Sequence, residues 1–138
     1  MILFDTNVVS EVLRPHPELQ VLSWLRSVPR RDIWTCSIVL AELFSGVDLM
    51  PAGNRQTLLR EKMDQLVPGL FMGQILLFDL PAARAYGHIL ALRKAKGRPM
   101  DETDAQIAAI ARVHGASLAT RNIRDFEHCG VHLINPWI

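Results

Sequence analysis

The chain has 138 residues, of which 49% are hydrophobic and 21% charged, and its formal net charge is +1. This length and composition predict one domain over residues 1–138 with a substantial core, and they exclude a disordered chain. The small net charge gives no general signal for a polyanion partner, although grouped acids could mask basic residues elsewhere.

Short apolar runs alternate with helical patterns along the chain. In order, the patterns predict a strand over 1–4, helices over 7–13 and 18–27, a strand over 33–35, helices over 38–49 and 55–67, a strand over 75–78, helices over 81–96 and 103–114, and strands over 117–120 and 131–134. Ser37 is expected to cap the helix over 38–49 and Thr103 to begin the one over 103–114, and Gly97 and Gly115 are expected to follow the ends of helices. Strands that alternate with helices favour an α/β fold whose parallel sheet is covered on both faces.

The cellular setting follows from what the sequence lacks. It has no basic leader with a cleavable apolar stretch, and no run of about 18 apolar residues that could span a membrane. We therefore expect a cytoplasmic protein without a membrane partner. Cys36 and Cys129 are expected to be buried, unpaired thiols. The five histidines are scattered, so their spacing does not indicate a zinc site.

Asp5 directly follows the first apolar run, and ligands of open α/β sheets bind beyond the carboxyl ends of strands. We expect this strand to be central and its acid to face a crevice. Glu42 is surrounded by apolar residues within its helix, which favours a position facing the crevice over the alternative of a solvated side chain.

Two further acidic stretches lie at the ends of predicted elements. Asp104 precedes a face of small residues suited to packing on a sheet, and Asp101 could share that face; the alternative is a favourable charge near the positive end of the helix. Asn122 and Asp125 can both present oxygen after a strand, although turn formation explains them equally well.

Taken together, these acids predict a cation site. Grouped carboxylates raise one another's pKa unless a cation neutralises them, and oxygen ligands suit Mg²⁺ or Mn²⁺. A metal ion held in this way can activate water and stabilise charge on a phosphodiester.

The order and spacing of these stretches resemble those of the PIN-domain ribonucleases, in particular the VapC toxins of bacterial toxin–antitoxin pairs and their FitB-like branch. The similarity spans essentially the whole chain. It is carried by Leu3-Phe4-Asp5-Thr6-Asn7-Val8-Val9-Ser10-Glu11, Ala41-Glu42-Leu43, Asp104-Ala105-Gln106-Ile107-Ala108-Ala109, Thr120-Arg121-Asn122 with Asp125-Phe126, and Asn135-Pro136-Trp137.

The resemblance implies a three-layer α/β/α sandwich with a mainly parallel sheet, and an endoribonuclease that depends on Mg²⁺ or Mn²⁺. It implies that Asp5, Glu42 and Asp104 form the metal-binding core. Some relatives carry Asp at the position of Asn122; here Asp125 supplies the charge, with Asn122 as a neutral ligand or substrate contact. Thr6 and Asn7 would contribute hydrogen bonds to the substrate site.

The resemblance also implies a homodimer, a VapB-type antitoxin that wraps the toxin, and binding of the complex to operator DNA. Trp24 and Leu25 could line an antitoxin groove or simply pack in the core, and core packing is favoured. The helices around Leu58 and Leu90 could form the dimer contact.

RNA approaching an acidic site needs basic contacts. The candidates are Arg84, Arg93, Lys94, Lys96, Arg98, Arg121 and Arg124. Arg121 is favoured because it adjoins the candidate ligand loop, whereas an ordinary solvated face explains most of the others.

Three other functions are alternatives to the ribonuclease. A phosphatase of the haloacid dehalogenase type needs a second Asp where this chain has Asn7, and a phospho-receiver domain needs an acidic pair that is absent. The alternative that stays open is a catalytically silent PIN-like module that only binds its antitoxin.

Overall fold

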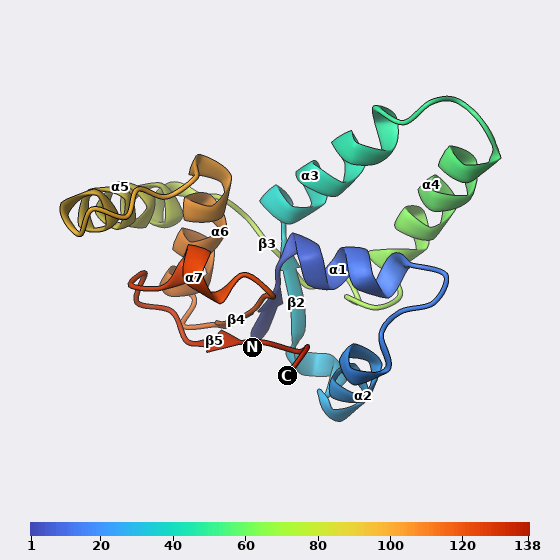
Figure 1. The fold of residues 1–138 in the computed structure, drawn as a ribbon, viewed down its shortest axis with the longest axis horizontal. Coiled ribbons are helices and arrows are strands. Elements are labelled where there is room, and N and C mark those ends of the chain that lie inside the picture. Colours follow the sequence, from blue (N-terminus) through green and yellow to red (C-terminus); the bar gives the residue numbers. More distant parts are fainter.

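A parallel sheet of five strands runs through the middle of the computed structural model, which describes residues 1–138 (Figure 1). The strands lie in the order β3-β2-β1-β4-β5, and every neighbouring pair is parallel. They span Ile2–Phe4 (β1), Ile33–Cys36 (β2), Ile75–Leu76 (β3), Ser117–Ala119 (β4) and Leu133–Ile134 (β5). The first strand is therefore central, as its position in the sequence predicts.

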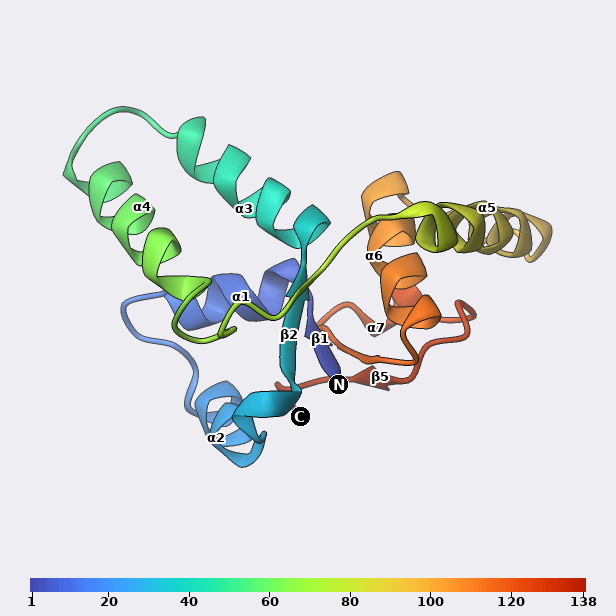
Figure 2. The same cartoon turned by 180° about the vertical axis from the view of Figure 1, so that it is seen from behind.

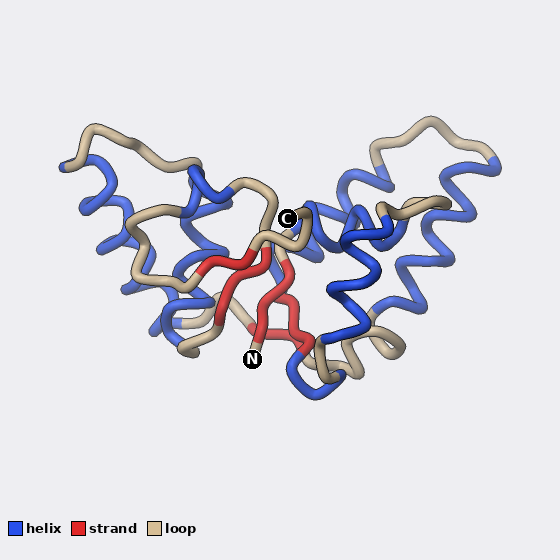
Figure 3. Tube along the Cα trace, turned by 60° about the horizontal axis from the view of Figure 1, so that its bottom comes forward, coloured by secondary structure: helices blue, strands red, loops and turns tan.

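Helices cover the sheet from two sides. They span Thr6–Leu13 (α1), Leu19–Ser27 (α2), Ser37–Asp48 (α3), Asn54–Leu66 (α4), Leu80–Ala95 (α5), Glu102–Val113 (α6) and Ile123–Phe126 (α7). Seen from behind, α1 to α4 lie on one side of the strands and α5 to α7 on the other (Figure 2). The strands lie between these two groups (Figure 3), which confirms the predicted α/β sandwich. None of these helices is both long and apolar enough to cross a bilayer.

The ends of several elements differ from the prediction. The strands expected over 75–78 and 131–134 are only two residues long, because each is an edge strand that pairs only where its inner neighbour is extended. Cys36, rather than Ser37, caps α3, and α6 begins one residue before Thr103 with Asp101 as its cap; neither cap residue uses its side chain to do so. The short helix α7 lies where the sequence indicated only a loop or turn.

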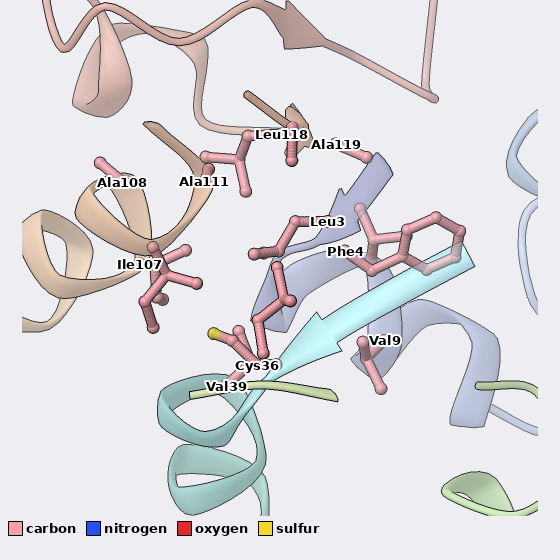
Figure 4. Close-up of a cluster of buried hydrophobic side chains, with 14 of the residues drawn as sticks. Leu3, Phe4, Val9, Cys36, Val39, Ile107, Ala108, Ala111, Leu118 and Ala119 are labelled. Carbon is pink, nitrogen blue, oxygen red and sulfur yellow. The ribbon is translucent and has the colours of Figure 1, made fainter. Parts of the chain in front are cut away.

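The core forms where α6 packs on the two central strands. Leu3 on β1 and Leu118 on β4 are fully buried and lie close to Ala111 of α6 (Figure 4). Alanine side chains let the helix backbone approach the sheet closely, as the small-residue pattern predicts. This packing fixes the start of α6, where Asp104 lies.

On the other side of the sheet, Phe4 packs against two aromatic rings. Its ring centroid lies 5.3 Å from that of Trp24 and 6.0 Å from that of Phe71. Trp24 and Leu25 pack against the core, which supports the core-packing alternative for both. Cys36 and Cys129 are buried and unpaired, as predicted, and burial raises the pKa of Cys36 to about 11.

Candidate functional site

Asp5 lies between the central strand and the first helix, with 4% of its surface exposed. Its backbone N–H donates to Ala119 O of the neighbouring strand, so the ladder places it at the carboxyl end of β1. One carboxylate oxygen accepts a hydrogen bond from the Thr6 N–H at 2.6 Å and caps α1; the other accepts from the Thr120 hydroxyl at 2.7 Å. Burial raises the pKa of Asp5 despite these two bonds.

Glu42 reaches the same edge of the sheet from α3. The Thr6 hydroxyl donates to its carboxylate at 2.9 Å, so Thr6 links Asp5 and Glu42 through its N–H and its hydroxyl. Glu42 as a residue is exposed, yet loss of solvent around the carboxylate raises its pKa, and repulsion from Asp5 adds to the effect. Asn7 lies half-buried in the first turn of α1, beside these residues in sequence.

Asp104 lies in the first turn of α6 and is half-buried. Burial raises the pKa of Asp104 to about 7, and repulsion from Asp5, Asp101, Asp125 and Glu42 contributes in that order. The four candidate acids therefore lie within one another's electrostatic field, although they come from separate elements. Asp101 belongs to the same field from its exposed position before α6.

The fourth acid lies on α7. Asp125 is exposed in this short helix, and Asn122 precedes it as the N-cap residue without capping through its side chain. Thr120 connects this segment to the centre: its hydroxyl donates to Asp5 and accepts a hydrogen bond from the Asn122 N–H at 3.1 Å. Thr120 was not predicted as a site residue, although it opens the Thr120-Arg121-Asn122 stretch that carries part of the family resemblance.

The acids have no cationic partner in the protein. The four ion pairs of the structure join Met1 with Asp32, Arg14 with Glu11, Arg60 with Asp48, and Arg98 with Glu127. At the same time, no three His, Cys, Asp or Glu side chains are grouped closely enough to enclose a metal ion. The site is thus an electrostatic cluster with unneutralised charge, and not a closed ligand cage.

The basic candidates have different environments. Arg93 is buried and bonded to backbone carbonyls, so its expected role as an RNA contact is wrong. Arg98 is half-buried and pairs with Glu127, which leaves it little freedom to bind a phosphate. Arg121 is exposed, and its guanidinium carbon lies 5.2 Å from the centre of the Trp137 ring. The other candidates, Arg84, Lys94, Lys96 and Arg124, are exposed.

A cavity of about 430 Å³ lies between α1, α3 and α4. Thr6 and Glu42 line it, whereas Asp5, Asp104 and Asp125 do not, so it adjoins the acidic cluster and does not enclose it. Leu58 also lines this cavity and is 54% exposed. Leu90 packs against the core, so it is less suited to the dimer contact expected near it.

Comparison with known proteins gives three close likenesses. The model of the PIN domain family matches residues 2–130 of this chain. The toxin FitB of Neisseria gonorrhoeae is 41% identical over 137 residues, which cover 99% of each chain. The VapC ribonuclease Y4jK of Sinorhizobium fredii is 38% identical over 137 residues, covering 99% of this chain and 98% of its own.

Among solved structures, FitAB bound to an IR36 DNA fragment superposes on this chain with a TM-score of 0.93 and 40% identity. The match covers 100% of this chain and 96% of the other. The likeness therefore includes all the elements that carry the acidic cluster.

Proposed function

Because the chain belongs to the PIN-domain family, we propose that it is a Mg²⁺- or Mn²⁺-dependent ribonuclease and the toxin of a toxin–antitoxin pair. One observation of the structure carries the proposal. Acids from four separate elements meet in one electrostatic field, and none of them pairs with a basic side chain. Unneutralised carboxylates in such a field favour a bound cation.

The donor set suits a hard divalent ion, because it consists of carboxylate, hydroxyl and amide oxygens. Asp5 and Asp104 would hold the ion, with Glu42 and Asp125 completing the site. Mg²⁺ keeps several of its water ligands and needs only one or two carboxylates, so an open cluster fits it better than a closed cage would. When bound, the ion would activate water and stabilise charge on the phosphodiester.

The protein's own groups would orient these acids. The Thr120 hydroxyl and the Thr6 N–H each hold one oxygen of Asp5, and the Thr6 hydroxyl holds Glu42. These neutral donors fix the carboxylates without cancelling their charge. Asn7 and Asn122 would offer amide groups to the substrate.

Arg121 would bind the RNA near the carboxyl ends of the strands, where its guanidinium stacks on the Trp137 ring. A guanidinium can pair with a phosphate through two parallel hydrogen bonds, and the exposed position of Arg121 leaves it free to do so. The charge of the bound cation would further reduce repulsion of the RNA backbone.

The proposed partners follow from the relatives. One solved relative is a FitAB complex on DNA, so we propose that this chain forms a homodimer, binds a VapB-type antitoxin, and with it binds operator DNA. The cavity between α1, α3 and α4 combines apolar residues such as Leu58 and Leu59 with Arg14, Arg55 and Lys62. It is suited to an antitoxin segment with an apolar face and acidic flanks.

The test is RNA cleavage by purified protein with Mg²⁺, with Mn²⁺ and with EDTA, beside Asp5→Asn and Asp104→Asn. Asp64→Asn is a matched control, because Asp64 is an exposed acid of α4 outside the cluster. We expect metal-dependent cleavage by the wild type and the control, and a loss of at least about a hundredfold in both site variants. Cleavage that survives Asp5→Asn would point to a contaminant. Intact RNA under every condition would favour the catalytically silent module.

A further inference from the structure

Arg93 lies in the last turn of α5, and only 4% of its surface is exposed. No carboxylate neutralises it, since none of the four ion pairs includes it. A buried charge without an ion-pair partner is costly, and an apolar side chain of similar size would often be as stable. Packing alone is therefore a poor account of an arginine at this position.

The hydrogen bonds of Arg93 indicate a more specific role. Its Nε donates to Arg98 O at 2.8 Å, and one terminal nitrogen donates to Asp125 O at 2.8 Å and to Glu127 O at 2.9 Å. The guanidinium thus joins the end of α5 to the end of α7, two segments about thirty residues apart in sequence.

Two of the accepting carbonyls, those of Asp125 and Glu127, lie at the C-terminal end of the short helix α7. The helix α7 has four residues, about one turn, and the last carbonyls of a helix have no partner within it. A cation at a helix C-terminus satisfies these carbonyls and matches the helix dipole. Arg93 supplies this cation from the protein interior.

Arg98 extends the same connection at the surface. It donates to Arg124 O at 3.1 Å and pairs with the Glu127 carboxylate at 2.8 Å. Together the two arginines bond to the carbonyls or side chains of Arg124, Asp125 and Glu127. Side chains from α5 and the turn after it therefore bond directly to α7, in addition to the burial of Phe126 in the core.

We propose that Arg93 is a positioning residue that holds Asp125 and Asn122 against the acidic cluster. Arg93 contacts the backbone of Asp125 and leaves its carboxylate free, so it can set the position of that charge without neutralising it. The proposal rests on the proposed ribonuclease function for its catalytic consequence, but the anchoring of α7 can be measured without any substrate.

The first test is amide hydrogen exchange of the 122–129 segment in wild type, Arg93→Met and Arg93→Lys. Methionine fills the space without donating hydrogen bonds, and lysine keeps the charge but loses the planar fork. We expect exchange in this segment to be roughly ten- to a hundredfold faster in Arg93→Met, as the loss of charged hydrogen bonds predicts. Arg26→Met, an exposed arginine of α2, is the matched control and should exchange like the wild type.

If Arg93→Met does not fold, the test rests on Arg93→Lys. This variant should fold and show a smaller increase in the exchange rate of the 122–129 segment. If the variant that folds exchanges the amides of residues 122–129 at the wild-type rate, the proposal is overturned. Exchange that rises equally throughout the chain would also overturn it, because Arg93 would then support the fold in general and not α7.

The second test is a double-mutant cycle for RNA cleavage with Arg93→Met, Asp125→Asn and the combined variant. We expect Arg93→Met to lower kcat about tenfold with little change in KM, and to lower it no further when Asp125 is already replaced. Additive losses would overturn the link between the two residues. If the wild type does not cleave RNA, the proposed function fails, while the exchange result still decides whether Arg93 holds α7.

Discussion

The carboxylate of Asp104 should make the stability of the metal-free protein decrease with pH. Burial, followed by repulsion from Asp5 and its other acidic neighbours, raises the pKa of Asp104 from 3.8 to about 7. A shift of about three units corresponds to roughly 4 kcal/mol, and solvent screening at this partly exposed position reduces the net effect to about 2 kcal/mol. The folded state holds the proton more tightly than the unfolded chain, so the free energy of unfolding falls as pH rises from about 4 to about 7.

Asp104→Asn removes this titration. In EDTA at pH 8 we expect the variant to be about 2 kcal/mol more stable than the wild type, and near pH 4 the two should be equal. The assay is urea unfolding followed by circular dichroism, with Asp64→Asn as the control that should show no such pH-dependent gain. Mg²⁺ should close the gap at pH 8 by stabilising the wild type. A variant no more stable than the wild type at pH 8 would refute the reasoning, because the carboxylate would then not experience the repulsion.

Three other substitutions test separate parts of the structure. Thr120→Val should lower stability by about 1–3 kcal/mol, because it leaves an oxygen of buried Asp5 without a donor; thermal unfolding measures it, and equal weakening by Thr120→Ser would contradict the role of the hydroxyl. Trp137→Leu should raise the KM for RNA roughly two- to fivefold at unchanged kcat, because Arg121 loses the ring beneath it. Steady-state kinetics measure both constants, and a fall in kcat alone would contradict a role of Trp137 in RNA binding. Phe4→Ala should cost about 3–5 kcal/mol of stability, with or without Mg²⁺; a loss that Mg²⁺ abolished would show that the residue acts on the cation site.

The type and order of most elements could be predicted from the sequence, because hydrophobic periodicity is local. The lengths of the edge strands could not. Leu77 continues the apolar run of β3 but is 61% exposed, since β2 has already turned into α3 at Ser37 and offers no further partner. Where a strand ends depends on its neighbour, which lies some forty residues away in sequence.

The proximity of the four candidate acids was predictable for a related reason. Asp5, Asp104 and Asp125 lie at or near the ends of elements, and parallel strands bring such ends to one edge of a sheet. Glu42 lies in the second turn of α3, the helix that directly follows β2. Their hydrogen-bond partners were not predictable. The contact between Thr120 and Asp5 arises from the pairing of β4 with β1, across 115 positions of the chain.

The prediction for Arg93 was wrong because its local sequence is misleading. It lies beside Lys94 in a basic stretch that is typical of a solvated helix face. The segment from Asp125 to Cys129, which begins 32 residues further along the chain, bonds to its guanidinium and helps to bury it. No pattern within α5 contains that information.

The donors around the cluster orient its carboxylates without neutralising them. The groups that bond to Asp5 and Glu42 are hydroxyls and an N–H, which orient a carboxylate and leave its charge in place. The nearby arginines are directed elsewhere, since Arg93 donates to carbonyls and Arg98 pairs with Glu127. If these acids served only packing, pairing them with such arginines would make the folded protein more stable, because burying an unpaired carboxylate lowers the free energy of unfolding. The arrangement keeps the negative charge available at the carboxyl end of the sheet, which is the electrostatic condition for a divalent ion to bind there.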